Sequence, residues 1–456
     1  MFAWLAFKNK AGQKTWALGN TSSAEAPITK VTRKTGAMDH GVAECVARVL
    51  TTRTFPMKTT TFRPVYVHGL AALLCTPTAL AQVDDSKPIS ATVKGHVFKP
   101  ARVEATDERV SQLKVPAGFE VTKFAEGLNK PRMISVTDAG LVYITDRDEG
   151  TVTLLRDADS DGKADDRQQV AQKDQLHGIA IKDRQIYLAT VNKIFVADLK
   201  KDGTLGELKP IITDLPDGGQ HGNRTLKFGP DGQLYISIGS TCNACAETNE
   251  ENATILKAKP DGSSRTIFAK GLRNTLGFDW HPETGQMWGM DHGIDWLGDE
   301  EQREELNMLE SGADYGWPYI YGEGKENPAD QPPKMSYEAY KQKTKYPVLT
   351  YEAHSAGLDM IFYRGEQFPK EYQGDAFVAM HGSWNRQNPV GYKVVRIRYE
   401  NGQPKQFEDF VSGFLLEDEK AQFGRVVGLA TYTDGSLLVT DDSNGLVYRV
   451  AYVGGS

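Results

Sequence analysis

The side chains most able to do chemistry are arginines and histidines that recur in short polar segments between residues 130 and 425. The segments are KPR at 130–132, QLH at 175–177, QHGNR at 220–224, RN at 273–274, HS at 354–355 and GR at 424–425. Arginine binds carboxylates through charge-assisted hydrogen bonds, and histidine exchanges a proton near neutral pH. If the fold brings these segments together, they predict a pocket for a multiply charged anion with a titratable base inside it.

A turn followed by an alternating β-type run recurs from residue 140 to the end of the chain. The copies are GLVYITD at 140–146, QIYLAT at 185–190, GQLYISI at 232–238, GQMWGMD at 285–291, GDAFVAM at 374–380 and GSLLVTD at 435–441. A short apolar strand precedes each copy and another follows most of them, so each unit is a small antiparallel meander. Such repetition is typical of a β-propeller. The sequence therefore predicts an all-β fold, a six-bladed β-propeller over residues 114–456.

The propeller fold accounts for the spacing of the polar segments. In a propeller the innermost strand of every blade lines the central channel, so the residues that lead into these strands collect around one mouth. Each polar segment stands just before such a strand. A lone arginine in this position is more often part of a structural ion pair, but six segments together favour a binding pocket.

Two segments fall outside the repeat. Residues 299–345 carry much charge, aromatic residues and proline between the fourth and fifth copies, and they predict an inserted loop on the top face. Residues 82–113 are polar and aperiodic. We interpret them as an N-terminal strap that leads into the propeller.

The N-terminal region has the pattern of a secretory signal over residues 57–81. Lys58 and Arg63 precede an apolar stretch, and the small residues Ala79 and Ala81 stand before Gln82. A signal stands at the start of a chain, so we expect translation to begin at Met57 and residues 1–56 to be a non-native upstream extension. A structured N-terminal extension is the alternative. The mature protein is expected to be periplasmic or secreted.

Cys242 and Cys245 are the cysteines of the expected mature chain, since Cys45 and Cys75 precede Gln82. Ala246 follows the pair where haem attachment requires histidine, and no second cysteine pair completes a zinc site. Export favours a disulfide. The alternative is that the two cysteines form a redox-active pair or stay reduced.

Two acidic segments are candidate Ca²⁺ sites. Residues 291–305 hold seven carboxylates directly after the fourth copy, which suits a hard cation, although a solvated acidic loop is the alternative. Residues 157–165 form the first half of a calcium loop, but Gln168 stands where that loop needs glutamate. A weak Ca²⁺ site and a polar turn are equally compatible with this segment. A metal site made by His177, His221 and His354 is less favoured, because each belongs to a different blade.

Composition excludes several classes of partner. The chain has 456 residues and a net charge of −7, and from Gln82 onward 43 Lys and Arg stand against 57 Asp and Glu, a net −14. A protein with this much negative charge repels phosphate groups. This argues against nucleic acid or an anionic membrane surface as its main partner. No apolar run reaches the roughly 18 residues of a membrane span.

Eight strings between residues 114 and 453 together resemble the soluble pyrroloquinoline-quinone (PQQ) sugar dehydrogenases, in particular the sorbosone and aldose dehydrogenase branch. They are PAGF at 116–119, QHGNR at 220–224 with FGPDG at 228–232, GLRN at 271–274, DHGIDWLGD at 291–299, ELN at 305–307, DYGWP at 314–318, HGSWNR at 381–386 and GYKVV at 391–395. The fold of that family is a six-bladed propeller. The resemblance therefore agrees with the repeat count.

The resemblance implies PQQ and Ca²⁺ as cofactors and assigns roles to individual residues. His221 matches the base that takes the proton from the anomeric hydroxyl, and Arg273 matches the cation beside the quinone oxygen. The implied cofactor-binding residues are Arg273, Asn274, His177, Arg425, Arg386 and Arg224. The implied Ca²⁺ ligands are Gly293, Ile294 and Glu304, where this sequence differs from its glucose-oxidising relatives in having Ile294 and a longer acidic run.

The implied reaction is oxidation of an aldose, or of a sorbosone-like aldehyde, to the lactone or acid by hydride transfer to PQQ. A downstream cytochrome or quinone would then accept the electrons. Two other classes of function are alternatives. A Ca²⁺-dependent propeller lactonase would favour carboxylates and Asn in the six segments, which here carry Arg or His, and a non-catalytic carbohydrate-binding propeller would require no cofactor.

Overall fold

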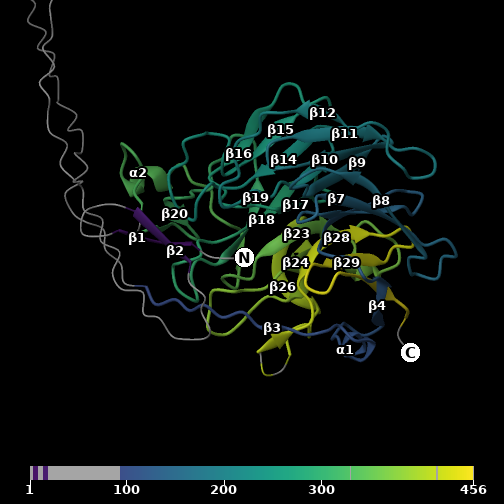
Figure 1. The fold of residues 1–456 in the computed structure, drawn as a ribbon. Helices are drawn as coiled ribbons and strands as arrows, with labels where there is room; N and C mark the ends of the chain where they lie inside the picture. The colour runs from purple at the N-terminus through teal and green to yellow at the C-terminus, as the bar shows by residue number, and fades with distance from the viewer. Residues whose placement is uncertain are drawn as a thin grey trace, which may run out of the picture.

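A computed structural model of the chain describes residues 4–8, 14–18, 93–328, 330–416, 418 and 420–454. Six four-stranded antiparallel sheets follow one another around the molecule in chain order, which confirms the predicted six-bladed β-propeller (Figure 1). The first three blades are β5 (Pro131–Val136), β6 (Val142–Asp146), β7 (Thr151–Arg156) and β8 (Asp166–Gln172); β9 (Gly178–Lys182), β10 (Gln185–Ala189), β11 (Ile194–Asp198) and β12 (Lys209–Ile212); and β13 (Leu226–Phe228), β14 (Leu234–Ile238), β15 (Thr254–Ala258) and β16 (Thr266–Lys270). The last three are β17 (Gly277–Trp280), β18 (Met287–Asp291), β19 (Glu304–Leu309) and β22 (Leu349–Tyr351); β23 (Gly357–Phe362), β24 (Ala376–Met380), β25 (Lys393–Glu400) and β26 (Gln403–Val411); and β28 (Val426–Thr431), β29 (Leu437–Asp441) and β30 (Leu446–Tyr452) with β4 (Phe119–Ala125).

The repeated sequence runs are the second strands of the blades. In β6, β14, β18, β24 and β29 every residue is buried, because neighbouring blades cover both faces of each sheet. Six apolar clusters fill the spaces between successive blades, including the space between the sixth and the first. The core is therefore a ring of inter-blade layers.

The ring is closed by strands from the two ends of the propeller. β4, which precedes the first blade in the chain, pairs antiparallel with β30, and Val450 lies opposite Val121. At the start of β4, Phe119 packs edge-on against Phe368, Phe410 and Tyr452. An N-terminal strand thus completes the sixth blade.

The insertion in the fourth blade differs from our expectation of one loop over residues 299–345. Strand β19 lies inside that range as the third strand of the blade, because Glu305 and Leu306 pair with Asp291 and Met290 of β18. The inserted chain proper follows β19 and contains β20 (Ile320–Tyr321), β21 (Lys325–Glu326) and α2 (Tyr337–Lys341). It leaves from the end of β19 remote from the first strand's start, yet it returns to the predicted face, where Lys325 pairs with Glu301 and Trp317 packs against Ile294.

The described N-terminal segments lie around the propeller. β3 (Ala101–Arg102) pairs in parallel with β27 (Ala421–Gln422), and α1 (Asp107–Ser111), capped by Thr106, leads toward β4. β1 (Trp4–Lys8) and β2 (Lys14–Leu18) form a two-stranded hairpin that the sequence did not suggest, and a short 3-10 helix, η1 (Lys370–Tyr372), precedes β24. The predicted signal over residues 57–81 lies outside the described residues. In the described part of the chain, no helix is long and apolar enough to cross a membrane.

Candidate active site

The six polar segments predicted from the sequence all lie at the start of the first strand of a blade: five directly precede it, and the segment at 130–132 runs into β5. Antiparallel pairing places the start of each first strand beside the end of the second, as Gly178 with Ala189 and Gly277 with Met290 show. The loops between second and third strands therefore lie on the same face, which we call the mouth. The longest of these loops cover residues 239–253, 292–303 and 381–392.

His221 is held in one tautomer by the loop that follows β14. Its Nδ1 lies 2.9 Å from the carbonyl oxygen of Ser240 and 2.8 Å from the Ser240 hydroxyl, which itself donates to the Cys242 carbonyl at 2.7 Å. A carbonyl only accepts, so Nδ1 carries the proton and Nε2 carries the lone pair. Burial, and then the charge of Arg273, lower the pKa of His221 well below 6.5. Among the described residues nothing bonds to Nε2, which leaves a neutral, basic nitrogen.

Arg273 is fixed by the disulfide loop, and its side chain is only 2% exposed. Cys242 and Cys245 are joined, which confirms the predicted disulfide, and Asn243 lies between them. Arg273 donates from Nε to the Asn243 carbonyl at 2.9 Å and from Nη2 to Asn243 Oδ1 at 2.7 Å, and Nη2 also lies 3.1 Å from Asp295. No described residue bonds to Nη1, so a cationic donor remains available. Sequence reasoning missed Asn243, although its place inside a predicted disulfide marked it as rigid.

Asn274 lies beside His221 across Gly239. A Cβ on Gly239 would come within 2.5 Å of His221 Cβ and 2.6 Å of Asn274 Oδ1, so only glycine allows this approach. Asn274 donates to His292 at 3.2 Å, while its Oδ1 is buried without a partner among the described residues. Asp291 accepts from the backbone of Arg273 and Asn274 at 2.9 and 2.8 Å, and it thereby orients both.

Glu304 has the properties expected of a ligand to a hard cation. It is buried, which raises its pKa to about 8, and Oε1 accepts from the Ala356 amide at 3.0 Å. Its Oε2 is buried and has no partner among the described residues. A cation such as Ca²⁺ would satisfy this oxygen, and Gly293 and Ile294 begin the loop that leads back to Glu304. The residues present therefore fit the implied ion.

The carboxylates of residues 291–305 differ in burial and in their partners. Asp291, Glu304 and Glu305 are buried, whereas Asp299 pairs with His96, Glu300 with Arg386 and Glu301 with Lys325. The segment is therefore mostly a paired loop and not a solvated one. In the second acidic segment, Asp157, Asp159 and Asp165 bring oxygens within 4.8 Å of one another.

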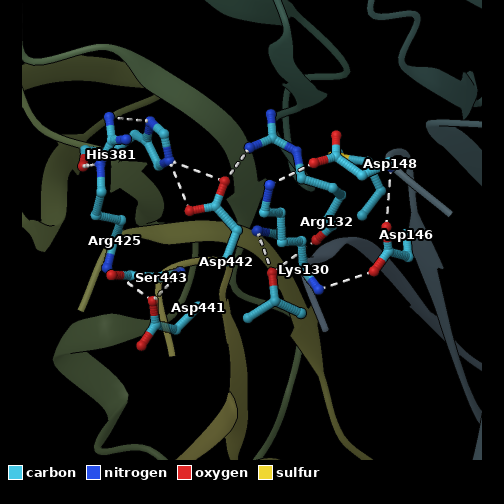
Figure 2. A network of polar contacts seen from close by, with 12 residues as sticks. Lys130, Arg132, Asp146, Asp148, His381, Arg425, Asp441, Asp442 and Ser443 are labelled. Carbon is cyan, nitrogen blue, oxygen red and sulfur yellow. Dashed lines mark hydrogen bonds and ion pairs between the residues drawn. The ribbon is translucent and has the colours of Figure 1, made fainter. Parts of the chain in front are cut away.

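Arg425 belongs to a network that joins the sixth, fifth and first blades (Figure 2). It donates to His381 Nδ1 at 2.9 Å, and His381 Nε2 lies 3.0 Å from Asp442. Arg132 also donates to Asp442. Burial, followed by the charge of Arg425, lowers the pKa of His381 to about 4. The network places Arg425 at the mouth as predicted and explains the HGSWNR string, whose histidine orients that arginine.

Three predicted cofactor-binding residues form hydrogen bonds within the protein, although Arg386 Nε and His177 Nε2 are buried without a partner among the described residues. Arg224 is fully buried and donates to the carbonyls of Val191, His221 and Pro216, which gives it the different role of holding the His221 segment. His177 is buried, with Nδ1 3.0 Å from the Arg224 carbonyl. Arg386 donates to the Ala353 carbonyl and to Glu300. The contacts of His177 with the Arg224 carbonyl and of Arg386 with Glu300 join different blades, so they could not be predicted from the sequence.

The three histidines of the sequence-based metal alternative do not gather into a site. His354 Nε2 lies 2.7 Å from the Gly298 carbonyl, while His177 and His221 bind other carbonyls. Within the residues the structure describes, the groups able to hold an ion do not include them.

Comparison with known proteins gives the family. The TrAA12-like family matches residues 113–453, which are 341 of the 456 residues. An uncharacterized protein from Borreliella burgdorferi is 34% identical over 366 residues, covering 76% of this chain and 93% of that protein. A pyrroloquinoline quinone-dependent pyranose dehydrogenase from Coprinopsis cinerea is 22% identical over 410 residues, covering 75% of this chain but 55% of that protein.

A solved structure shows that the fold is shared. The calcium structure of Trichoderma reesei Carbohydrate-Active Enzymes Family AA12 has a TM-score of 0.67 at 21% identity, covering 75% of this chain and 98% of that one. Together the matches confirm the resemblance to PQQ-dependent sugar dehydrogenases. The chain belongs to the TrAA12-like family.

Proposed function

We propose that this protein is an exported dehydrogenase that uses PQQ and Ca²⁺ to oxidise the anomeric hydroxyl or aldehyde of a sugar to the lactone or acid. The observation that carries the proposal is the pairing of His221 and Arg273 at one mouth. His221 offers a neutral nitrogen with a free lone pair, and Arg273 offers a buried cation with a free donor. A base and a cation are what removal of a hydroxyl proton with growth of negative charge requires.

The cofactor assignment rests on the donor set. PQQ carries carboxylates, and Arg273, Asn274 and Arg425 place cationic or amide donors at the mouth. The unpartnered oxygens of Glu304 and Asn274 are the kind of ligand that Ca²⁺ takes. Gly293 and Ile294 would add backbone carbonyls. Relatives named for PQQ and a calcium structure within the same family support both cofactors.

The chain's own residues supply the proton chemistry. His221 Nε2 would take the proton of the sugar hydroxyl, while Ser240 keeps the proton on Nδ1 and so preserves the productive tautomer. Arg273 would stabilise the negative charge that develops as the proton leaves. When bound, the quinone supplies the acceptor for the hydride, which comes from the carbon that bears this hydroxyl. His221 would thus hold the proton that the sugar loses, and the hydride would be left to the chemistry that the cofactor supplies.

The cellular setting is part of the proposal. The signal-like residues 57–81 and the disulfide support a periplasmic or secreted protein. A cytochrome or quinone would reoxidise the cofactor there.

Reconstitution tests the function. Purified apo-protein is loaded with PQQ and Ca²⁺, and dye reduction is measured with aldoses, sorbosone-like aldehydes and uronic acids. We expect turnover with at least one sugar only when both cofactors are present. Chelation should then release quinone, measured by absorbance, and Ca²⁺ should restore binding better than Mg²⁺. Absence of turnover with every sugar, or quinone retained after exhaustive chelation, would contradict the proposal.

A further inference from the structure

Arg147 lies at the mouth, and among the described residues only the charge of neighbouring Asp148 acts favourably on it. It directly follows β6, where Asp146 pairs with Pro131 at the start of β5, so the register places it on the mouth face. Its side chain is half-buried, and its Nε is buried without an acceptor. No described residue forms a hydrogen bond or ion pair with its guanidinium. A half-buried cation without an acceptor is costly, and a bound anion would offset that cost.

The carboxylates of Asp146, Asp148 and Asp442 are occupied by groups other than Arg147, and Figure 2 shows these three side chains with their partners. Asp146 accepts from the Lys130 amide at 2.8 Å and from the amides that follow it, Asp148 pairs with the Lys130 side chain, and Asp442 binds Arg132 and His381. The protein therefore supplies an acceptor to each neighbouring cation but none to Arg147.

Arg147 also reaches the segment that carries the base. A Cβ on Gly222, the residue after His221, would lie 3.4 Å from Arg147 Nη2. The local field is positive: burial, and then the charges of Arg132, Arg147 and Arg224, lower the pKa of His177 to about 3. An acceptor that enters beside His221 would meet an unneutralised cation.

The position of Arg147 in the ring indicates which ligand it would contact. Arg147 belongs to the first blade and Arg273 leads into the fourth, and these blades are opposite in a ring of six. A cofactor held by Arg273 would extend from the fourth-blade side of His221 toward Arg425, which leads into the sixth blade. The near side is left for the end of the sugar remote from its anomeric carbon.

We propose that Arg147 forms a carboxylate subsite beside His221, and that the preferred substrate is a hexuronate, a sugar with a carboxylate at the end opposite its anomeric carbon. This inference rests on the proposed function and names its substrate class. The paired N–H groups of Arg147 would donate two hydrogen bonds to the carboxylate. They would thereby orient the anomeric hydroxyl toward His221 Nε2.

Binding to the apo-protein tests the subsite without turnover. Calorimetry at pH 7 with D-glucuronate, its neutral amide D-glucuronamide and D-glucose should show the carboxylate bound about tenfold more tightly or better. This comparison uses the wild-type protein, so it does not depend on how any variant folds. Equal affinities for D-glucuronate and D-glucuronamide would overturn the proposal.

Variants then identify the residue and the source of the carboxylate. Arg147→Met should abolish the preference for D-glucuronate, and Arg147→Lys should keep part of it. Arg398→Met is the matched control and should keep all of it, because it removes a half-buried arginine of β25 that pairs with Glu408 of β26. A preference unchanged in Arg147→Met, or PQQ affinity falling about tenfold there while the sugar preference persists, would overturn the assignment. The dye-reduction assay tests the proposed function separately, since a neutral aldose can support turnover without this subsite.

Discussion

The Ser240 carbonyl determines which nitrogen of His221 is basic, and burial beside Arg273 determines when that nitrogen is free of a proton. Both effects come from residues remote in sequence that the fold brings to one loop. A histidine near its ordinary pKa of 6.5 would be partly protonated in a mildly acidic compartment. The lowered pKa keeps His221 competent there.

The pH dependence of kcat/KM tests this property. Raising the pH removes the proton from Nε2, so kcat/KM should rise with pH through the His221 pKa and then stay level. Because that pKa is lowered, the midpoint should lie below 6.5 and the plateau should include pH 7. Rates measured from pH 4 to 8 at constant bound quinone provide the check. A midpoint at or above 6.5 would show that His221 is not the buried, neutral base described here.

Replacement of Arg273 should affect both binding and rate. We expect Arg273→Ala to weaken PQQ binding, measured by fluorescence titration, and to lower kcat by about 10²–10³ in the protein that still binds it. Arg398→Ala, at a half-buried arginine of β25 whose pairs with Glu400 and Glu408 lie outside the site, is the matched control. Normal PQQ affinity in Arg273→Ala would remove this residue from the cofactor site.

The disulfide loop is an element whose role is local. Asn243 holds Arg273 through two hydrogen bonds, and the Cys242–Cys245 bond restricts that residue. The enclosed loop is very short, so the chain-entropy contribution to global stability is about 2 kcal/mol or less.

We therefore expect Cys242→Ser with Cys245→Ser to lower kcat while changing the unfolding free energy little. Asn243→Ala, which keeps the disulfide and removes the side-chain acceptor, should lower kcat in the same direction. Denaturant unfolding and turnover per bound quinone separate the two effects. Wild-type turnover in both variants would contradict the idea that this loop positions Arg273.

Some strands could be predicted from the sequence and others could not. The second strands are buried on both faces and follow turn residues, so each gives a local apolar signal that can be counted. β22 has only three residues, and β19 lies within a charged stretch. The sequence analysis therefore predicted a loop where the structure has the third strand of the fourth blade and did not identify the fourth strand. Arg147 was missed for a similar reason, because it sits in a charged turn and only contacts across the mouth distinguish it.

At the scale of the whole molecule, stability depends on closing the ring through β4. Phe119 is 6% exposed at the junction of the fifth and sixth blades. We expect Phe119→Ala to cost about 3–5 kcal/mol, the range for a buried aromatic truncated to alanine. Val97→Ala, at a side chain 63% exposed, should change stability by less than about 0.5 kcal/mol. Equal denaturation midpoints for the two variants would contradict closure by this strand.

The six-bladed fold and the convergence of the polar segments followed from the sequence, because each depends on a repeat. The choice of which arginines remain available to a ligand did not. Arg224 donates to protein carbonyls from Nε, Nη1 and Nη2, whereas Arg273, Arg147 and Arg386 each keep a donor without a partner among the described residues.

The most direct test of the central claim is kcat per bound quinone in His221→Gln. A general base contributes about 10²–10⁴ in rate and little to ground-state affinity, so this variant should bind PQQ normally and lose turnover by such a factor. Denaturation of the same sample controls for lost folding. A kcat within a few-fold of wild type per bound quinone would contradict the account and remove His221 from the mechanism.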